Sequence, residues 1–329
     1  MFQRFWKKLP GHVFYSGISS IVAVIAIGTL AVLTFSPKPP TDNPPPFTIT
    51  VDPAAKTIKV DEKIEEAFRS KNTLSASVAT AAGTVFDWIA LSVNSSPWYV
   101  NLANPPIRYV TIFPGYRKEQ VANAFATQLS WSAAEKTAFL SSTVEDPPTI
   151  PEGRFQPATY ELAPETDSLQ VRSAIADRFQ KEIVARYTPE LEETVPLETA
   201  LRIASIIERE AGSVSEMRTI SGIIWNRLFI GMKLQMDATL QYAKGTQKNG
   251  WWPKVVPKDK YLKSTYNTYQ YEGLPPTPIA SPSVNAVEAA LNPEKTDCYY
   301  YFHHRRIFYC STTYDEHVAT LIKKFGSGK

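Results

Sequence analysis

The chain has 329 residues, which is enough for one or two domains with a sizeable hydrophobic core. Its 35 Lys and Arg residues nearly balance 32 Asp and Glu residues, and the formal net charge of +3 gives no reason to expect a nucleic-acid partner. The four histidines are poorly placed for a catalytic triad, and the sequence has neither zinc-ligand spacing nor a glycine-rich phosphate motif. We therefore expect no metal and no cofactor, and the chemistry has to come from carboxylates, amides and phenols.

Near the N-terminus, residues 13–35 form a run of about 23 residues without a charged side chain, whereas a bilayer needs about 20. This run predicts a transmembrane helix, with residues 1–36 forming a cytoplasmic tail and the helix. Arg4, Lys7 and Lys8 precede it, so the positive-inside rule places the N-terminus in the cytoplasm and the remainder outside. We expect a single-pass protein of the cytoplasmic membrane. A cleaved signal peptide is the alternative, but its apolar region is usually only about 7 to 15 residues long.

The next segments are predicted to hold the globular part away from the membrane. Residues 37–46 are rich in proline and predict an extended linker. Residues 47–165 predict a membrane-proximal accessory region of mixed α+β structure. In this region the expected strands are 47–51, 56–60 and 107–113, and the expected helices are 62–70, 75–93 and 118–129. Turn residues in 152–162 predict a loop there.

Residues 166–329 predict a C-terminal domain of mixed α+β structure, so the fold class is α+β. Capping boxes are expected at Ser213 with Glu216 and at Thr313 with Glu316, and Asp237 is expected to be an N-cap. Residues 245–261 predict a surface insertion, whose Trp251 and Trp252 either stack on sugar or fill the core. Residues 265–282 predict a long loop. The expected helices span residues 169–187, 197–212, 213–229, 237–243, 283–292 and 313–325.

One carboxylate in the second of these helices is a candidate general acid. At about 3.6 residues per turn, Glu210 lies on one stripe with Ile203, Ile206 and Ile207. A carboxyl group among isoleucines is expected to have a raised pKa, because desolvation disfavours its charged form. A carboxyl group that stays protonated near neutral pH can act as a general acid. Glu208 points elsewhere and nearer to solvent. The alternative is that Glu210 pairs with an arginine at a frayed helix end.

The chain has two cysteines, Cys298 and Cys310, on either side of residues that alternate between aromatic and β-branched types. This pattern predicts a hairpin in which the two thiols lie nearly opposite each other. A disulfide is expected if the compartment is oxidising, and two buried free thiols are the alternative.

Four blocks of the sequence stand out together, in chain order residues 204–210 (ASIIERE), 226–242, 266–278 and 291–302. In this order they resemble the YceG-like, or MltG-like, endolytic murein transglycosylases. Residues 152–162 (EGRFQPATYEL) also resemble a segment of that family, and residues 47–105 loosely resemble its LysM-like subdomain. Three positions depart from the family pattern, namely Pro114 before Gly115, Ala158 and Ala211, and they bear on substrate positioning more than on the reaction.

The resemblance implies cleavage of the β-1,4 bond between N-acetylmuramic acid and N-acetylglucosamine in peptidoglycan strands, without water and with a 1,6-anhydro end. It assigns catalysis to Glu210, the residue that the helical stripe also selects. Cell-wall synthesis enzymes are further expected partners. The expected substrate-binding residues are Gln235, Asp237, Tyr266, Asn267, Thr268 and Tyr269, with Glu208, Asn226 and Arg227 in support.

For each of these supporting and binding residues, a structural role such as capping or loop pinning is the alternative. Arg227 is expected to hold either Glu208 or a peptide carboxylate. Two other functions remain open. One is a catalytically inactive glycan-binding or scaffold protein on the membrane, and the other is a muramidase-type hydrolase with Asp237 as its second carboxylate.

Overall fold

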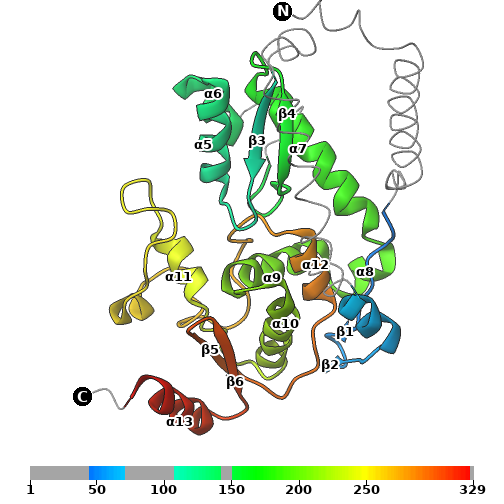
Figure 1. The fold of residues 1–329 in the computed structure, drawn as a ribbon, viewed down its shortest axis with the longest axis vertical. Helices are drawn as coiled ribbons and strands as arrows, with labels where there is room; N and C mark the ends of the chain where they lie inside the picture. Colours follow the sequence, from blue (N-terminus) through cyan, green and yellow to red (C-terminus); the bar gives the residue numbers. More distant parts are fainter. Residues whose placement is uncertain (1–43, 71–106, 142–149, 327–329) are drawn as a thin grey trace, which may run out of the picture. The chain divides into compact units, whose positions relative to one another are not determined.

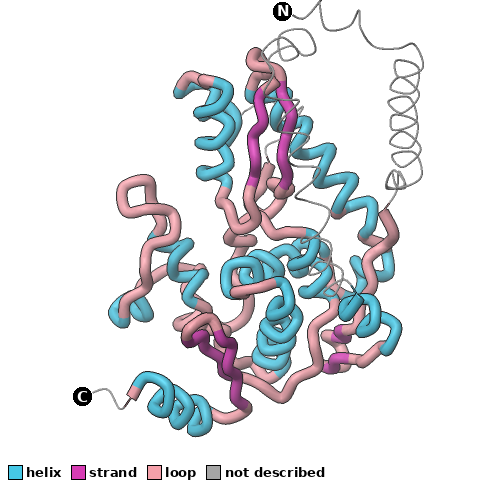
Figure 2. Tube along the Cα trace, in the orientation of Figure 1, coloured by secondary structure: helices cyan, strands magenta, loops and turns pink. Residues whose placement is uncertain are grey.

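The computed structural model describes residues 44–70, 107–141 and 150–326 (Figure 1). The chain divides into a unit that ends at Pro44 and a unit that starts at Pro45, and the fold below is that of the second unit. The predicted transmembrane helix 13–35 and the predicted helix 75–93 lie outside the described residues. None of the helices in the described ranges combines the length and the apolar character that a membrane span requires. The secondary structure is mixed α+β, as predicted, and its sheets are short (Figure 2).

The first described elements are a pair of very short strands and one helix. Strand β1 (Val51–Asp52) pairs antiparallel with β2 (Thr57–Ile58), so the two predicted strands exist but are only two residues long each. A helix follows over residues 62–70, where it was expected. Val51 and Ile58 are buried in the larger hydrophobic core.

A smaller core forms where β3 (Arg108–Ile112) pairs antiparallel with β4 (Ala158–Leu162). Helix α5 (Lys118–Leu129) packs on β3, and α6 (Ala133–Ser141) packs on α5 and on α7 (Ser168–Glu182). The prediction that residues 152–162 form a loop is wrong for their second half, because 158–162 gain a full set of strand partners from 108–112. Helix α6 was not predicted.

Helix α7 links the smaller core to the larger one. Its Val171 and Ile175 belong to the smaller core, whereas Phe179 belongs to the larger. A predicted domain boundary after residue 165 therefore lies next to an element that serves both cores, and that division stays a prediction. A short 3-10 turn, Val184–Arg186, and the unpredicted helix α8 (Pro189–Thr194) follow.

The larger core is built on three helices that pack on one another, α9 (Leu197–Glu210), α10 (Val214–Phe229) and α12 (Val284–Leu291). Figure 1 shows α9 between α10, α12 and the shorter helix α11 (Asp237–Lys244). Helix α10 begins after Ser213 as predicted, but the expected capping box does not form. The Ser213 hydroxyl bonds Ser215 (2.9 Å) instead, while the Glu216 carboxylate accepts from the Gly212 N–H (2.8 Å).

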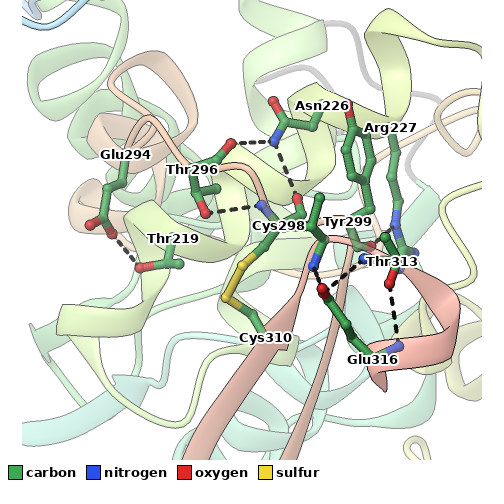
Figure 3. Close-up of a disulfide and its surroundings, with 11 residues drawn as sticks. Thr219, Asn226, Arg227, Glu294, Thr296, Cys298, Tyr299, Cys310, Thr313 and Glu316 are labelled. Atoms are coloured by element: carbon green, nitrogen blue, oxygen red, sulfur yellow. Dashed lines mark hydrogen bonds between the residues drawn. A yellow bond between two sulfur atoms is a disulfide. The ribbon is translucent and has the colours of Figure 1, made fainter. Parts of the chain in front are cut away.

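The C-terminal part is the predicted hairpin, with β5 (Tyr300–His304) antiparallel to β6 (Ile307–Ser311). Cys298 and Cys310 form a disulfide, with their Cα atoms 5.8 Å apart (Figure 3). Helix α13 (Tyr314–Phe325) packs on the hairpin and starts with the expected capping box, since Thr313 accepts from the Glu316 N–H and the Glu316 carboxylate accepts from the Thr313 N–H.

Candidate functional site

The candidate site lies at the C-terminal end of α9. Ile203, Ile206 and Ile207 are fully buried in the larger core, as the helical stripe predicts. Glu210 is the last residue of the helix, because Ala211 adopts an extended conformation (φ −73°, ψ 132°) that ends the helical hydrogen bonding. The stripe therefore carries the Glu210 side chain to the edge of the core, where it is half-buried.

Two hydrogen-bond donors hold the Glu210 carboxyl group. Oε1 accepts from the backbone N–H of Ala238 in the first turn of α11 (3.0 Å), and Oε2 accepts from the Tyr301 hydroxyl on β5 (2.9 Å). Burial raises the pKa of Glu210, although both donors act in the opposite direction by favouring the carboxylate, and the charge of Asp237 adds to the increase. The raised pKa agrees with the prediction made from the isoleucine stripe. Burial favours the protonated form and the two donors favour the carboxylate, so the group can both release and accept a proton.

A second carboxylate, that of Asp237, lies in the first turn of α11. Helix α11 starts at Asp237 itself, and Met236 is its N-cap residue, so the expectation that Asp237 caps the helix is wrong by one position. Asp237 Oδ1 instead accepts from the Tyr269 hydroxyl (2.7 Å), and Asp237 is exposed. The contact joins two of the predicted binding residues near Glu210.

The loop that carries Tyr269 is held in place by buried amide and hydroxyl groups. The Asn267 amide donates to the carbonyls of Lys260 (3.1 Å) and Leu262 (2.8 Å), and its oxygen accepts from the Tyr269 N–H (3.0 Å). Asn267 is fully buried. The structure therefore gives this residue a role in positioning Tyr269.

Thr268 acts in the same way on the segment before α11. Its hydroxyl accepts from the Met236 N–H (3.0 Å) and bonds Thr239 (2.9 Å), and its carbonyl accepts from the Gln235 N–H (3.0 Å). Thr268 is buried, whereas the Gln235 side chain is exposed and its backbone is left-handed (φ 51°). Thr268 therefore has the structural role of holding the loop in place, whereas Gln235 is open to solvent.

Tyr266 is half-buried in an aromatic cluster. Its hydroxyl bonds Thr277 (2.8 Å), and its ring centroid lies 4.8 Å from that of Tyr242. Asn226 donates to the carbonyls of Thr296 (2.7 Å) and Cys298 (3.2 Å), as Figure 3 shows. Asn226 thus anchors the disulfide segment rather than approaching Glu210 directly.

The expected pairing of Arg227 with Glu208 is wrong, whereas a peptide carboxylate as the partner of Arg227 stays a prediction. Arg227 is buried and donates to the carbonyls of Tyr299 (2.7 Å) and Leu234. Glu208 points away from Glu210, as predicted, but it is half-buried and accepts from both the N–H (2.9 Å) and the hydroxyl (2.6 Å) of Ser283. Glu208 therefore fixes the residue that caps α12.

The most important residue that sequence reasoning missed is Tyr301. Its hydroxyl donates to Glu210, yet the two residues are 91 positions apart. Alternation in β5 puts Tyr301 and His303 on one face of the strand, where His303 Nε2 lies 3.0 Å from Glu216. This alternation was visible in the sequence, but the face that turns toward α9 was not.

The two tryptophans of the insertion connect the site to the smaller core. Trp252 donates through Nε1 to Gln120 of α5 (2.8 Å), and the Arg209 guanidinium lies 3.9 Å from the Trp252 ring centre. The Arg117 guanidinium carbon lies over the Trp251 ring, 5.1 Å from the ring centre. Both rings remain half-buried. Over the described ranges, no group of three or more His, Cys, Asp and Glu side chains is arranged to hold a metal ion.

The chain is similar to curated proteins that are named endolytic murein transglycosylase. An endolytic murein transglycosylase from Bacillus subtilis (strain 168) is 32% identical over 213 residues, which cover 59% of this chain and 58% of that protein. An endolytic murein transglycosylase from Streptococcus pneumoniae (strain D39) is 27% identical over 223 residues, covering 60% of this chain and 40% of that protein. The match thus spans well under two thirds of each relative.

Structure comparison agrees with the sequence matches. A crystal structure of a yceG-like protein from Listeria monocytogenes superposes with a TM-score of 0.57 at 27% identity, covering 67% of this chain and 77% of that one. The model of the YceG-like family matches residues 89–323, well over half of the chain, and includes all the candidate residues above. The chain therefore belongs to the YceG-like family.

Proposed function

We propose that this protein is an endolytic lytic transglycosylase of peptidoglycan, with Glu210 as its general acid and base. Family membership and two relatives named endolytic murein transglycosylase support the reaction class. The observation that carries the residue assignment is the half-buried Glu210 carboxyl group, with a raised pKa and two donors ready to stabilise its charged form.

The proposed reaction needs only one carboxyl group. Protonated Glu210 gives its proton to the glycosidic oxygen as the bond between that oxygen and C1 of N-acetylmuramic acid breaks. The resulting carboxylate then takes the proton from the C6 hydroxyl of the same sugar as its oxygen bonds C1. The products are a 1,6-anhydro end and a free 4-hydroxyl group. Because the nucleophile is tethered to the reacting sugar, its proximity replaces the second carboxylate of a hydrolase.

The contacts of Glu210 suit both steps. Burial favours the protonated carboxyl group that the first step needs, whereas the Ala238 N–H and the Tyr301 hydroxyl stabilise the carboxylate once the proton has left. Asp237, held by Tyr269, supplies negative charge beside an oxocarbenium-like transition state. We propose Gln235, Asp237, Tyr266 and Tyr269 as substrate contacts, and Asn267 and Thr268 as the residues that position them.

We further propose that residues 13–35 anchor the protein in the cytoplasmic membrane, with the catalytic part on the outer side. The charge asymmetry around this apolar run supports the orientation. An extracytoplasmic position also suits a disulfide between Cys298 and Cys310. Cell-wall synthesis enzymes are proposed neighbours in the same membrane.

Cleavage of purified glycan strands in H₂¹⁸O tests the reaction class. A transglycosylase takes no oxygen from water, so mass spectrometry should show unlabelled anhydro ends. The neighbouring Asp237 carboxylate is the observation that favours a hydrolase as the second candidate, because it could activate water. Reducing ends that carry ¹⁸O would establish the hydrolase and contradict our proposal.

A further inference from the structure

Residues 244–263, the segment that continues from the end of α11 (yellow in Figure 1), carry a strong excess of positive charge. They include six lysines and one acidic residue, Asp259, so their formal charge is +5 in a chain whose total formal charge is +3. Lys244 pairs with Asp259. The other five lysines are exposed: Lys248, Lys254, Lys258, Lys260 and Lys263.

This basic segment is tied to the candidate site by several contacts. The Lys260 ammonium lies 4.8 Å from the centre of the Tyr269 ring, and the Tyr269 hydroxyl bonds Asp237. The carbonyls of Lys260 and Leu262 accept from the buried amide of Asn267. The lysines are therefore presented from a backbone that is fixed against the residues around Glu210.

One arginine beside the site forms no ion pair among the described residues, although the charges of Glu208 and Glu210 favour its charged form. Arg209 precedes Glu210, and its guanidinium stacks on Trp252 at 3.9 Å. Its buried Nε atom has no hydrogen-bond partner among the described residues. Gly115 (φ 81°) makes room for it, since a Cβ there would lie 3.1 Å from both Cδ and Nη1 of Arg209. The Trp252 ring is itself fixed by its bond to Gln120.

We propose that Arg209 and the basic segment 244–263 together bind carboxylates of the peptide stems on the glycan strand. The inference rests on the proposed function, in which a strand lies across Glu210. Neutral sugar rings need no positive field, whereas each peptide stem carries carboxylates. Arg209 neighbours the general acid, so it meets the stem of the sugar that is cleaved, and the lysines meet stems further along. A planar guanidinium held on an aromatic ring suits recognition of a carboxylate.

Two substrates and four variants of the full-length chain test the proposal. The substrates are glycan strands with intact stems and the same strands after an amidase has removed the stems. Arg209→Gln removes the central charge, and Arg209→Lys keeps it without the planar group. Lys254→Gln with Lys258→Gln removes two exposed charges from the segment. Lys295→Gln with Lys323→Gln removes two exposed charges elsewhere and is the matched control.

Wild type should cleave stem-bearing strands with a kcat/KM about 10-fold above that for stripped strands, which is the size expected of one charged hydrogen-bonded contact. Arg209→Gln should remove most of this preference, Arg209→Lys should keep part of it, and the remainder in Arg209→Gln comes from the lysines. The double Lys254/Lys258 variant should lower the ratio a few-fold at about 0.1 M salt but leave it unchanged at about 1 M salt. At the higher concentration the Debye length is about 3 Å instead of about 10 Å, so the exposed charges are screened. The control pair should match wild type.

Equal cleavage of both substrates by wild type would overturn the proposal while leaving the reaction intact. If wild type cleaves neither substrate, the proposed function fails. Recognition of the peptide stems is then tested separately, by measuring how much protein binds each kind of strand. Co-sedimentation of Glu210→Gln with the two kinds of strand should still favour the stem-bearing one, and equal retention would refute it. A third outcome would assign the segment to the membrane instead. In that case the protein shows no preference between the two kinds of strand, and its binding to phosphatidylglycerol vesicles is lost in the Lys254/Lys258 variant.

Discussion

At the residue scale, the contact between Tyr301 and Glu210 makes a specific kinetic prediction. Tyr301→Phe removes a donor that favours the Glu210 carboxylate, so the pKa of Glu210 should rise further. We expect kcat/KM to fall about 10-fold, as for the loss of one hydrogen bond to a charged group. The high-pH limb of the pH–rate profile should move to higher pH, because the acid then stays protonated longer.

The matched control for Tyr301→Phe is Tyr300→Phe, on the other face of β5, where Tyr300 packs against Tyr314 and His317. That variant should keep the wild-type profile. An unchanged pH–rate profile in Tyr301→Phe would separate Tyr301 from the function of Glu210.

The environment of Glu210 could be predicted from the sequence, whereas the position of Tyr301 could not. Glu210 was predictable because its environment comes from its own helix, through isoleucines three, four and seven positions away. Tyr301 was not, because its position depends on how a hairpin packs on α9. The absence of the expected Arg227–Glu208 pair has the same origin, since the observed partners of Arg227 are carbonyls of loops whose paths the sequence does not fix.

At the element scale, the disulfide hairpin positions Tyr301, since Cys310 is the register partner of Tyr301 on β6. The bond closes a loop of 12 positions and should stabilise the fold by about 3 kcal/mol. Replacing both Cys298 and Cys310 by serine should lower Tm by several degrees and reduce activity a few-fold. Wild type treated with a reductant should behave like the double variant.

Circular dichroism melts with and without the reductant check this prediction, and the double variant, which has no disulfide, serves as the control because it should not respond to the reductant. A wild-type Tm that is insensitive to reduction would mean that the hairpin does not depend on its disulfide.

Elements that depend on local pattern were predicted well, and those that depend on distant partners were not. Helix α5 follows from its own sequence and has the predicted bounds, 118–129. Strand β4 follows turn-forming residues, and its strand character comes from pairing with β3 about 50 positions earlier. Likewise, α11 starts one residue earlier than expected, so Asp237 is its first residue and its side chain accepts from the Tyr269 hydroxyl instead of capping the helix.

At the scale of the whole molecule, Glu152 links the two cores and makes stability depend on pH. It is buried, accepts from the Lys118 N–H that begins α5 (3.0 Å), and receives the Tyr242 hydroxyl of α11 at 3.4 Å. Burial, with a smaller contribution from the Glu119 charge, raises the pKa of Glu152 from 4.5 to about 8. The folded protein therefore holds a proton that the unfolded chain releases.

The pKa of Glu152 is higher in the folded state than in the unfolded chain. The contribution of Glu152 to the free energy of unfolding is therefore greatest below about pH 4.5 and falls as the pH rises toward 8. The slope from Glu152 is at most about 1.4 kcal/mol per pH unit. Glu152→Gln keeps an acceptor for the Lys118 N–H and should remove this slope from the free energy of unfolding. Urea unfolding at several pH values measures it.

Glu161→Gln changes an exposed carboxylate on β4 and is the control for this experiment. It should leave the pH dependence as in wild type. If Glu152→Gln has the wild-type slope between pH 5 and pH 8, Glu152 is ionised in the folded protein and the link between the cores has a different basis.

The most direct test of Glu210 as the general acid is to compare the products of glycan cleavage by Glu210→Gln and Glu208→Gln, two variants at carboxylates of α9. Glu210→Gln should fold but form anhydro ends at least about 100-fold more slowly than wild type, since a general acid contributes about 10²–10⁴-fold. Glu208→Gln, which loses only a contact to Ser283, should keep most activity. Mass spectrometry of the anhydro ends gives both rates. Near-normal activity in Glu210→Gln, or its loss only in Glu208→Gln, would contradict the assignment of Glu210.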